Sequence, residues 1–290
     1  MHQYLKAIGF NQMSKKELQE ILEQTKTHFT HQTIVSYEDT VDFCEFQKEY
    51  GQDVGITICG ELEEWDTFNA DYYFPYYQGS GVTTYAEVTI ERKYEREQYL
   101  GVCEDPNVGI SLIFTLQNGV EYMKERQIGL ASGVETSITL SGLALAGKIL
   151  LPVQKNEMQR QSVREASDNR KMLLDAARSG DPTAIETLTL EDIDTYSMVS
   201  RRLMCEDVFT IVDTYFMPYG VECDLYAILG EILAVRKREN ILTKETLYQM
   251  KLQVNELDFD VCVPAKEVLG EPEIGRRFKG NIWLQGFINF

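Results

Sequence analysis

Residues 247–263 read LYQMKLQVNELDFDVCV, and this stretch predicts two β-strands, at 247–254 and 257–263. The second strand alternates: the apolar side chains of Leu257, Phe259, Val261 and Val263 are separated by Asp258, Asp260 and Cys262. A period of two places one set of side chains on the buried face of a sheet and the other set on its outer face. The stretch therefore indicates a half-buried sheet in the C-terminal part of the chain.

Other apolar and β-branched runs on either side of this stretch predict further strands, at 208–217, 223–229, 232–237 and 282–288. Five or six antiparallel strands so close together in sequence can close into a small barrel of the OB or SH3-like kind. A helix starting near Thr189 is expected before the strands. Residues 182–290 are therefore predicted to form a helix followed by a barrel-like domain.

The N-terminal half predicts an α+β domain with a mixed sheet. An apolar opening at 4–10 favours a strand, and Ser14 with Glu17 forms a capping box that starts a helix over about 15–28. Strands are then expected at 33–37, 41–50 and 55–62. A second series follows the same order, with a strand at 109–116, a helix at 120–126, and strands at 134–140, 143–146 and 149–153, with Gly142 and Gly147 as kinks or turns. Two β-α-β-β-β-like units, a possible duplication, are thus predicted within 1–153.

Charge divides the chain of 290 residues into three parts. Residues 1–153 carry a net charge of −12, residues 154–181 carry +1, and residues 182–290 carry −7. The middle part is helical in composition but polar nearly all round, which is typical of a helix that bridges two domains. We therefore expect a polar linker helix at 154–181 between an α+β domain at 1–153 and the barrel-like domain at 182–290.

The net charge of −18 makes nucleic acid an unlikely partner and a membrane surface a poor one, because both are anionic. None of the six cysteines lies in a C-x-x-C pair, which favours free thiols in a reducing compartment. The first residues have no long apolar segment, and the longest apolar run, 143–153, is too short to span a bilayer. We expect a cytoplasmic protein.

Recognisable catalytic and cofactor patterns do not occur in the sequence. There is no Gly-x-Ser-x-Gly elbow and no Walker loop, so no catalytic residue and no cofactor is predicted. His28 and His31 are the only histidine pair and form a weak candidate for a metal site. The alternative is that they mark the end of the preceding helix, where positive charge is favoured. No metal is predicted.

An aromatic segment supplies the candidate contact residues. Tyrosine combines a large apolar area with a polar tip and is common in binding surfaces. Pro75 lacks an amide donor, so the segment is not expected to be a central strand. The rings either form a ligand or partner surface or cover a sheet. The candidates are Trp65, Tyr72, Tyr73, Tyr76 and Tyr77.

One basic patch stands out in the acidic C-terminal part. Arg276, Arg277 and Lys279 flank Phe278, a mixture that oligonucleotide-binding barrels use. The alternative is an ordinary turn before the last strand. A nucleic-acid-binding barrel therefore remains one of the functional alternatives.

Three stretches resemble an uncharacterised family of about 290 residues from Gram-positive anaerobic bacteria, classed as a domain of unknown function. They are YLKAIGF at 4–10, the run from SGLA at 141–144 to Leu151-Pro152, and RRFKGNIWLQG at 276–286. The resemblance implies a bacterial cytosolic protein and supplies no activity.

The doubled order of elements also resembles the vicinal-oxygen-chelate architecture, whose enzymes hold a divalent metal with His and Glu between two repeats. Apart from His2, no strand expected in either unit carries a histidine within its run. The resemblance therefore implies a ligand-binding or partner-binding protein more than a metal enzyme.

A non-enzymatic binding or regulatory protein of the cytoplasm is the function these features favour. Its partner is expected to be another protein or a small molecule, and homo-oligomers are possible. The alternatives are a small-molecule, metal-dependent enzyme that uses the N-terminal sheet, and the nucleic-acid-binding barrel.

Overall fold

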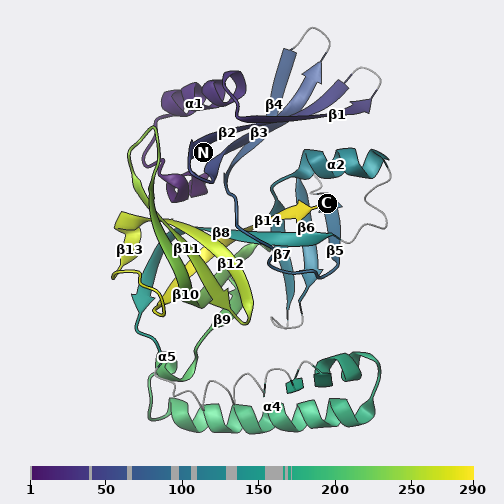
Figure 1. The fold of residues 1–290 in the computed structure, drawn as a ribbon, viewed down its shortest axis with the longest axis vertical. Helices are drawn as coiled ribbons and strands as arrows, with labels where there is room; N and C mark the ends of the chain where they lie inside the picture. The colour runs from purple at the N-terminus through teal and green to yellow at the C-terminus, as the bar shows by residue number, and fades with distance from the viewer. Residues whose placement is uncertain are drawn as a thin grey trace.

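A computed structural model of the chain describes residues 2–38, 41–63, 67–92, 98–105, 110–128, 136–153, 166, 169–170 and 172–290 (Figure 1). The helical elements are η1 (Gln3–Ile8), α1 (Lys15–Thr27), α2 (Gly119–Ile128), α4 (Pro182–Leu203), α5 (Val208–Ile211) and η2 (Ala265–Glu267). The strands are β1 (His31–Glu38), β2 (Val41–Gly51), β3 (Val54–Glu63), β4 (Thr67–Tyr77), β5 (Val88–Arg92), β6 (Tyr99–Glu104), β7 (Ser111–Leu116), β8 (Ser137–Leu150), β9 (Tyr215–Pro218), β10 (Leu225–Glu239), β11 (Thr246–Val254), β12 (Leu257–Pro264), β13 (Val268–Leu269) and β14 (Arg277–Asn289).

Two sheets make up the fold, and the predicted α+β class is confirmed. The first is an antiparallel sheet of four strands in the order β1-β2-β3-β4. Helix α1 packs on it: Ile21 is buried, and the Thr25 hydroxyl lies 2.9 Å from the Tyr50 hydroxyl. The predicted capping box starts this helix, since Ser14 accepts a hydrogen bond from the Glu17 amide and Glu17 from the Ser14 amide.

The second sheet closes on itself and contains the predicted barrel. Strands β8, β12, β11, β10 and β14 follow one another, and β14 pairs back to β8. The ring differs from the predicted antiparallel barrel, because β8 comes from residues before 154 and pairs with β12 in parallel. The strands predicted at 223–229 and 232–237 are one strand, β10, and β9 pairs with β10 outside the ring. Strands β7, β6 and β5 extend the sheet from β14.

The predicted opening strand is wrong, because Gln3–Ile8 form the 3₁₀-helix η1. Its buried residues are Tyr4, Leu5, Ala7 and Ile8. Apolar side chains at positions i, i+1, i+3 and i+4 suit a helical turn packed on one side, whereas a strand would bury alternate residues. Gly9 ends the turn with a positive φ of 95°, which glycine adopts without strain.

The three short strands predicted within 134–153 are one continuous strand, β8. Gly142 and Gly147, interpreted as turns or kinks, lie inside it. A Cβ at Gly147 would lie 2.2 Å from the Phe278 ring. These glycines therefore let β14 approach β8 closely. Close approach of another strand is a common reason for glycine within a strand. The second predicted β-α-β-β-β unit accordingly has one strand after its helix.

Helix α2 and the segment η1 join the two sheets. Helix α2 follows β7 of the barrel sheet and reaches sheet β1–β4, where the Gln127 side chain donates to the Ser36 carbonyl at 2.7 Å. Figure 1 shows η1 between the four-stranded sheet and the barrel. One hydrophobic cluster includes Tyr4 and Ile8 of η1, Val120 of α2 and Trp283 of β14. The two sheets therefore share a core.

The predicted linker at 154–181 lies largely outside the described residues, because only 166, 169–170 and 172–181 are described. Strands from both sides of this segment share the barrel sheet, as β8 pairs with β12, β13 and β14. In the described part of the chain, no helix has both the length and the apolar character that a membrane crossing requires.

Arg277 attaches α5 and the end of β8 to the barrel. Its buried guanidinium donates to the carbonyls of Leu151 at 3.0 Å, Val212 at 2.8 Å and Phe209 at 2.8 Å. These carbonyls come from the two segments that lead to α4 and away from it. The Arg277 side chain therefore ties both segments to strand β14.

Replacing Arg277 by methionine should lower the free energy of unfolding by about 2–3 kcal/mol, because hydrogen bonds from a charged donor are lost and buried carbonyls lose their partner. Arg277→Lys should give an intermediate loss, since lysine keeps the charge but not the planar fork. Urea denaturation followed by circular dichroism measures both. Two variants within about 0.5 kcal/mol of the wild type would show that the attachment adds no stability.

Candidate functional site

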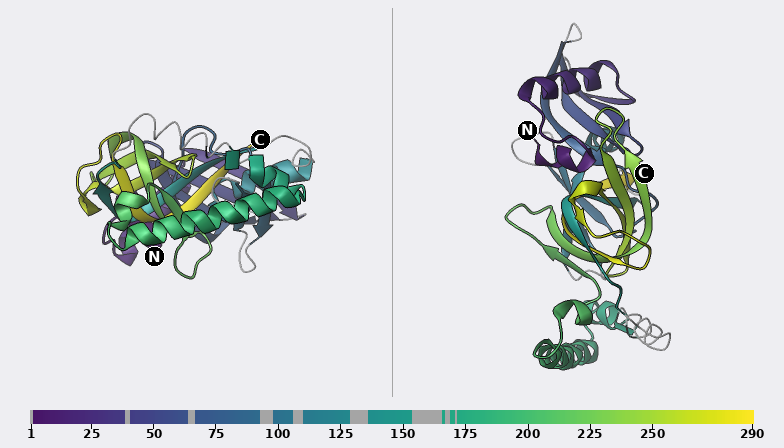
Figure 2. Two further views of the ribbon diagram at one scale, coloured as in Figure 1. Left: turned by 90° about the horizontal axis from the view of Figure 1, so that it is seen from below. Right: turned by 90° about the vertical axis from the view of Figure 1, so that its left-hand side faces the viewer.

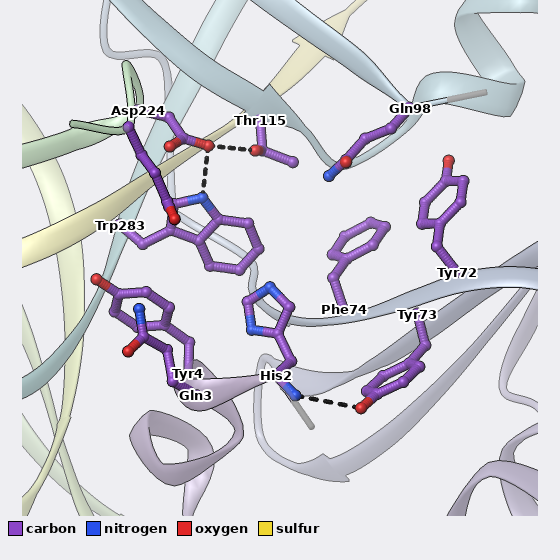
Figure 3. A pocket seen from close by; sticks show the side chains of 11 residues that line it. His2, Gln3, Tyr4, Tyr72, Tyr73, Phe74, Gln98, Thr115, Asp224 and Trp283 are labelled. Atoms are coloured by element: carbon purple, nitrogen blue, oxygen red, sulfur yellow. Dashed lines mark hydrogen bonds between the residues drawn. The ribbon is translucent and has the colours of Figure 1, made fainter. Parts of the chain in front are cut away.

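A pocket of about 370 Å³ opens where the four-stranded sheet, η1 and the barrel sheet meet. Pockets that bind small molecules commonly measure roughly 300–1,000 Å³. Figure 3 shows its side chains converging from elements far apart in the sequence. The lining residues are His2, Gln3, Tyr4, Tyr72, Tyr73, Phe74, Gln98, Thr115, Glu222, Asp224 and Trp283.

Asp224 is the buried carboxylate of this pocket, with 6% of its surface exposed. One carboxylate oxygen, Oδ2, accepts hydrogen bonds from the Trp283 indole N–H at 2.7 Å and from the Thr115 hydroxyl at 2.8 Å (Figure 3). The Asp224 carbonyl accepts from the Leu284 amide at 2.9 Å, which fixes the backbone beside β14. The carboxylate is thus held by Thr115 of β7 and Trp283 of β14, and the Asp224 backbone by the Leu284 amide of β14.

The donors to this carboxylate are neutral groups. Among the described residues, no ion pair includes Asp224 or Glu222. Of the eleven lining side chains, His2 is the one that can carry a positive charge. A buried carboxylate without a full countercharge favours a positively charged ligand.

Aromatic rings form the other walls of the pocket. The Trp283 ring centroid lies 4.6 Å from that of His2, 5.3 Å from that of Tyr4 and 6.5 Å from that of Phe74. Tyr73 adds a hydroxyl that accepts from the His2 amide at 3.2 Å. Faces of Trp, Tyr and Phe attract cations within about 6 Å of the ring centroid.

The phenol of Tyr4 stays neutral at physiological pH. Burial, followed by the charges of Glu222 and Asp224, raises the pKa of Tyr4 to about 12. The same two carboxylates that disfavour a phenolate would disfavour an anionic ligand and attract a cation. Geometry and charge therefore indicate a site for a positively charged group against aromatic faces.

A buried polar cluster lies behind the wall that Tyr72 forms. The Cys59 thiol donates to Glu45 at 3.9 Å, and the Gln47 amide donates to the same carboxyl at 2.8 Å. Burial raises the pKa of Glu45 to about 8, and the charge of Glu121 acts in the same direction. Burial also raises the pKa of Tyr72, with Cys59 as the next cause. Both the Glu45 carboxyl and the Tyr72 phenol are therefore protonated, and so uncharged, at neutral pH.

The family model described as "Domain of unknown function, E. rectale Gene description (DUF3881)" matches residues 5–286. The chain belongs to this family. The expected membership of a domain-of-unknown-function family is thereby confirmed. Comparison with curated proteins and with solved structures gives no match.

In this DUF3881 chain the predicted tyrosines divide into two pairs along β4. Tyr72 and Tyr73 line the pocket. Tyr76 and Tyr77 are buried, and burial raises the pKa of both phenols. As expected from Pro75, β4 is an edge strand, and the Pro75 carbonyl accepts from the Gln285 amide at 2.8 Å. Trp65 lies outside the described residues.

The three residues of the predicted basic patch have different surroundings. Arg277 is buried, as described above. Arg276 pairs with Glu273 at 2.9 Å, and the Lys279 ammonium lies 4.2 Å from the Phe209 ring centroid. Nucleic-acid binding by these residues stays a prediction.

The two candidate metal ligands lie on different elements. His28 follows the last residue of α1, and its ring nitrogen lies 2.9 Å from the Thr27 hydroxyl. His31 begins β1, and its ring nitrogen lies 3.3 Å from the Thr33 hydroxyl. Within the described ranges, no three His, Cys, Asp or Glu side chains are grouped as metal ligands.

Sequence reasoning missed the residues that give the pocket its charge and its main ring. More than a hundred positions in sequence separate Tyr72 from Asp224 and from Trp283, and Thr115 belongs to the other sheet. The one local signal was Trp283 itself, which lies in the stretch at 276–286 that resembles the family. A tryptophan within a barrel strand, however, is equally typical of a core.

Proposed function

We propose that this family member is a cytoplasmic binding protein whose pocket takes a small organic cation. The observation that carries the proposal is Asp224, a buried carboxylate that receives neutral donors beside a wall of aromatic rings. An ammonium group in the pocket would complement the carboxylate and lie against the face of Trp283, Tyr4 or Phe74.

The predicted cytoplasmic location is part of this proposal. Cys44, Cys59, Cys103, Cys205 and Cys262 are free thiols, and Cys205 is exposed. Exposed free thiols suit a reducing compartment. Organic amines are protonated there at neutral pH, so the ligand class and the location agree.

A thermal-shift panel tests the ligand class. Tetramethylammonium, choline and tryptamine should each be compared with a neutral isostere in which carbon replaces the charged nitrogen. A ligand that binds only the folded state raises the melting temperature as its concentration exceeds the dissociation constant. We expect at least one cation to raise the melting temperature while its isostere does not.

Two variants show whether the shift depends on this pocket. Asp224→Asn keeps the shape of the side chain and removes the charge, and should abolish the shift. Asp71→Asn removes an exposed charge from the same strand as Tyr72 and should leave the shift intact. The proposal fails if no cation shifts the melting temperature, or if both variants reduce the shift equally.

A further inference from the structure

Helix α4 lies beyond the barrel, at the end of the molecule opposite the four-stranded sheet (Figures 1 and 2). Asp181 caps its start by accepting from the Thr183 amide at 2.9 Å, and Pro182 follows at the first helical position. Its 22 residues make a helix about 33 Å long. The helix is thus long enough to carry an interface of its own.

Near its start α4 buries one face, whereas residues 189–198 are exposed on every side of the helix. Ala184 and Leu188 are buried. Ile185, Ile193 and Tyr196 expose 50%, 56% and 76% of their surface. Positions i, i+8 and i+11 lie on one side of a helix, so these three residues form one apolar stripe, while Leu190 and Met198, 58% and 56% exposed, lie elsewhere on the helix. Scattered exposed apolar residues are ordinary, whereas a stripe on one helix marks a surface that another element covers.

The charges of α4 point to what covers it. The first two-thirds of the helix are acidic, with Glu186, Glu191, Asp192 and Asp194, and the last turn is basic, with Arg201 and Arg202. Asp192 pairs with Arg170 at 2.8 Å, and Arg202 pairs with Glu206 at 2.7 Å. Among the described residues, Glu186 and Arg201 belong to no ion pair.

The stretch of sequence that contains this helix also carries little net charge. Residues 154–203 carry a net charge of −1, whereas the whole chain carries −18. Two copies that met through any acidic face would repel each other. Two copies that meet through α4 avoid most of that repulsion.

We propose that the occupant of the stripe is α4 of a second copy of this chain, packed antiparallel about a two-fold axis near Ile193. Such an interface uses the same patch on both copies. In an antiparallel pair, the same flank of each helix faces its counterpart. Glu186 and Arg201 lie on one flank, so Arg201 of each copy meets Glu186 of the other. In a parallel pair, opposite flanks would face each other, so Glu186 and Arg201 would not meet.

Sedimentation equilibrium of the full chain tests the interface. The wild type should show twice the chain mass of 33.3 kDa at micromolar concentration. Ile193→Glu should give the monomer mass, because a charge enters the apolar stripe on both copies. Ile274→Glu is the matched control, since Ile274 is also exposed but lies between β13 and β14, and this variant should stay dimeric.

Circular dichroism must show the same helix content in each variant, and Tyr196→Asp serves as a second disrupting variant. A wild type that is monomeric at every concentration would overturn the proposal. So would a dimer that survives both Ile193→Glu and Tyr196→Asp, because another surface would then hold it.

A charge swap tests the antiparallel direction. Arg201→Glu alone should raise the dissociation constant of the dimer at least about tenfold, a difference of about 1.4 kcal/mol. The double variant Glu186→Arg with Arg201→Glu restores opposite charges across an antiparallel pair and should recover most of the affinity. If the double variant is as weak as Arg201→Glu, the antiparallel arrangement is wrong.

Discussion

Replacing Trp283 by alanine should lower the free energy of unfolding by about 3–5 kcal/mol, the usual range for a large buried aromatic residue. Trp283 exposes 4% of its surface and belongs to the cluster that joins the two sheets. Its loss leaves a cavity beside Tyr4 and removes one of the two side-chain donors to Asp224. Urea denaturation at neutral pH measures the change.

Trp283→Phe separates the two contributions. Phenylalanine keeps most of the buried apolar area but has no indole N–H, so the remaining loss of about 1–3 kcal/mol reports the donor to the Asp224 carboxylate. The alanine variant should be clearly less stable than the phenylalanine variant. If the free energy of unfolding of the alanine variant lies within about 1 kcal/mol of the wild-type value, Trp283 does not stabilise the packing between the two sheets.

The buried carboxyl of Glu45 should make the folded protein less stable as the pH rises. In the folded protein its pKa is about 8, above the ordinary value of 4.5. Between these two pH values the unfolded chain has released the proton and the folded chain still holds it. The free energy of unfolding therefore falls with increasing pH in this window, by up to about 1.4 kcal/mol for each pH unit from this group.

Glu45→Gln removes this contribution, because the amide does not titrate and resembles the protonated carboxyl in shape. We expect the variant to gain stability relative to the wild type as the pH rises from 4.5 to about 8, and to keep a constant difference above that. Denaturation at several pH values measures the difference. Glu49→Gln, at an exposed position of the same strand, is the control and should follow the wild-type curve. Parallel curves for the wild type and Glu45→Gln would contradict the raised pKa.

Local signals in the sequence predicted many of the elements. The capping box of Ser14 and Glu17 predicted α1, and alternation predicted β12. Both signals arise from residues close together in the sequence, and their local interactions are the same in any fold. Where the signal had two physical meanings, the prediction was wrong. Glycine at 147 suits a turn or a close approach, and only the position of Phe278 decides between them.

The pairing of strands could not be predicted in the same way. Strand β8 completes the barrel with strands that lie more than a hundred residues further along the chain. Such pairing depends on long-range packing, which leaves no periodic trace in one sequence. Tyr72 and Tyr73 were predicted as contact residues for their chemistry alone. Asp224 was not, because a lone aspartate before a strand is usually part of a turn.

The proposed function rests on the charge of Asp224, and a titration of Trp283 fluorescence tests it most directly. The chain has two tryptophans, so a Trp65→Phe background leaves Trp283, in the wall of the pocket, as the reporter. The cation that gives the largest thermal shift, or choline if none does, should change the fluorescence saturably, and its neutral isostere should not. In the same background, Asp224→Asn should raise the dissociation constant about tenfold or more, and Asp71→Asn should leave it unchanged. Equal affinity for the cation and its isostere, no saturable response, or an Asp224→Asn variant that binds as tightly as the background, would contradict a cation-binding pocket.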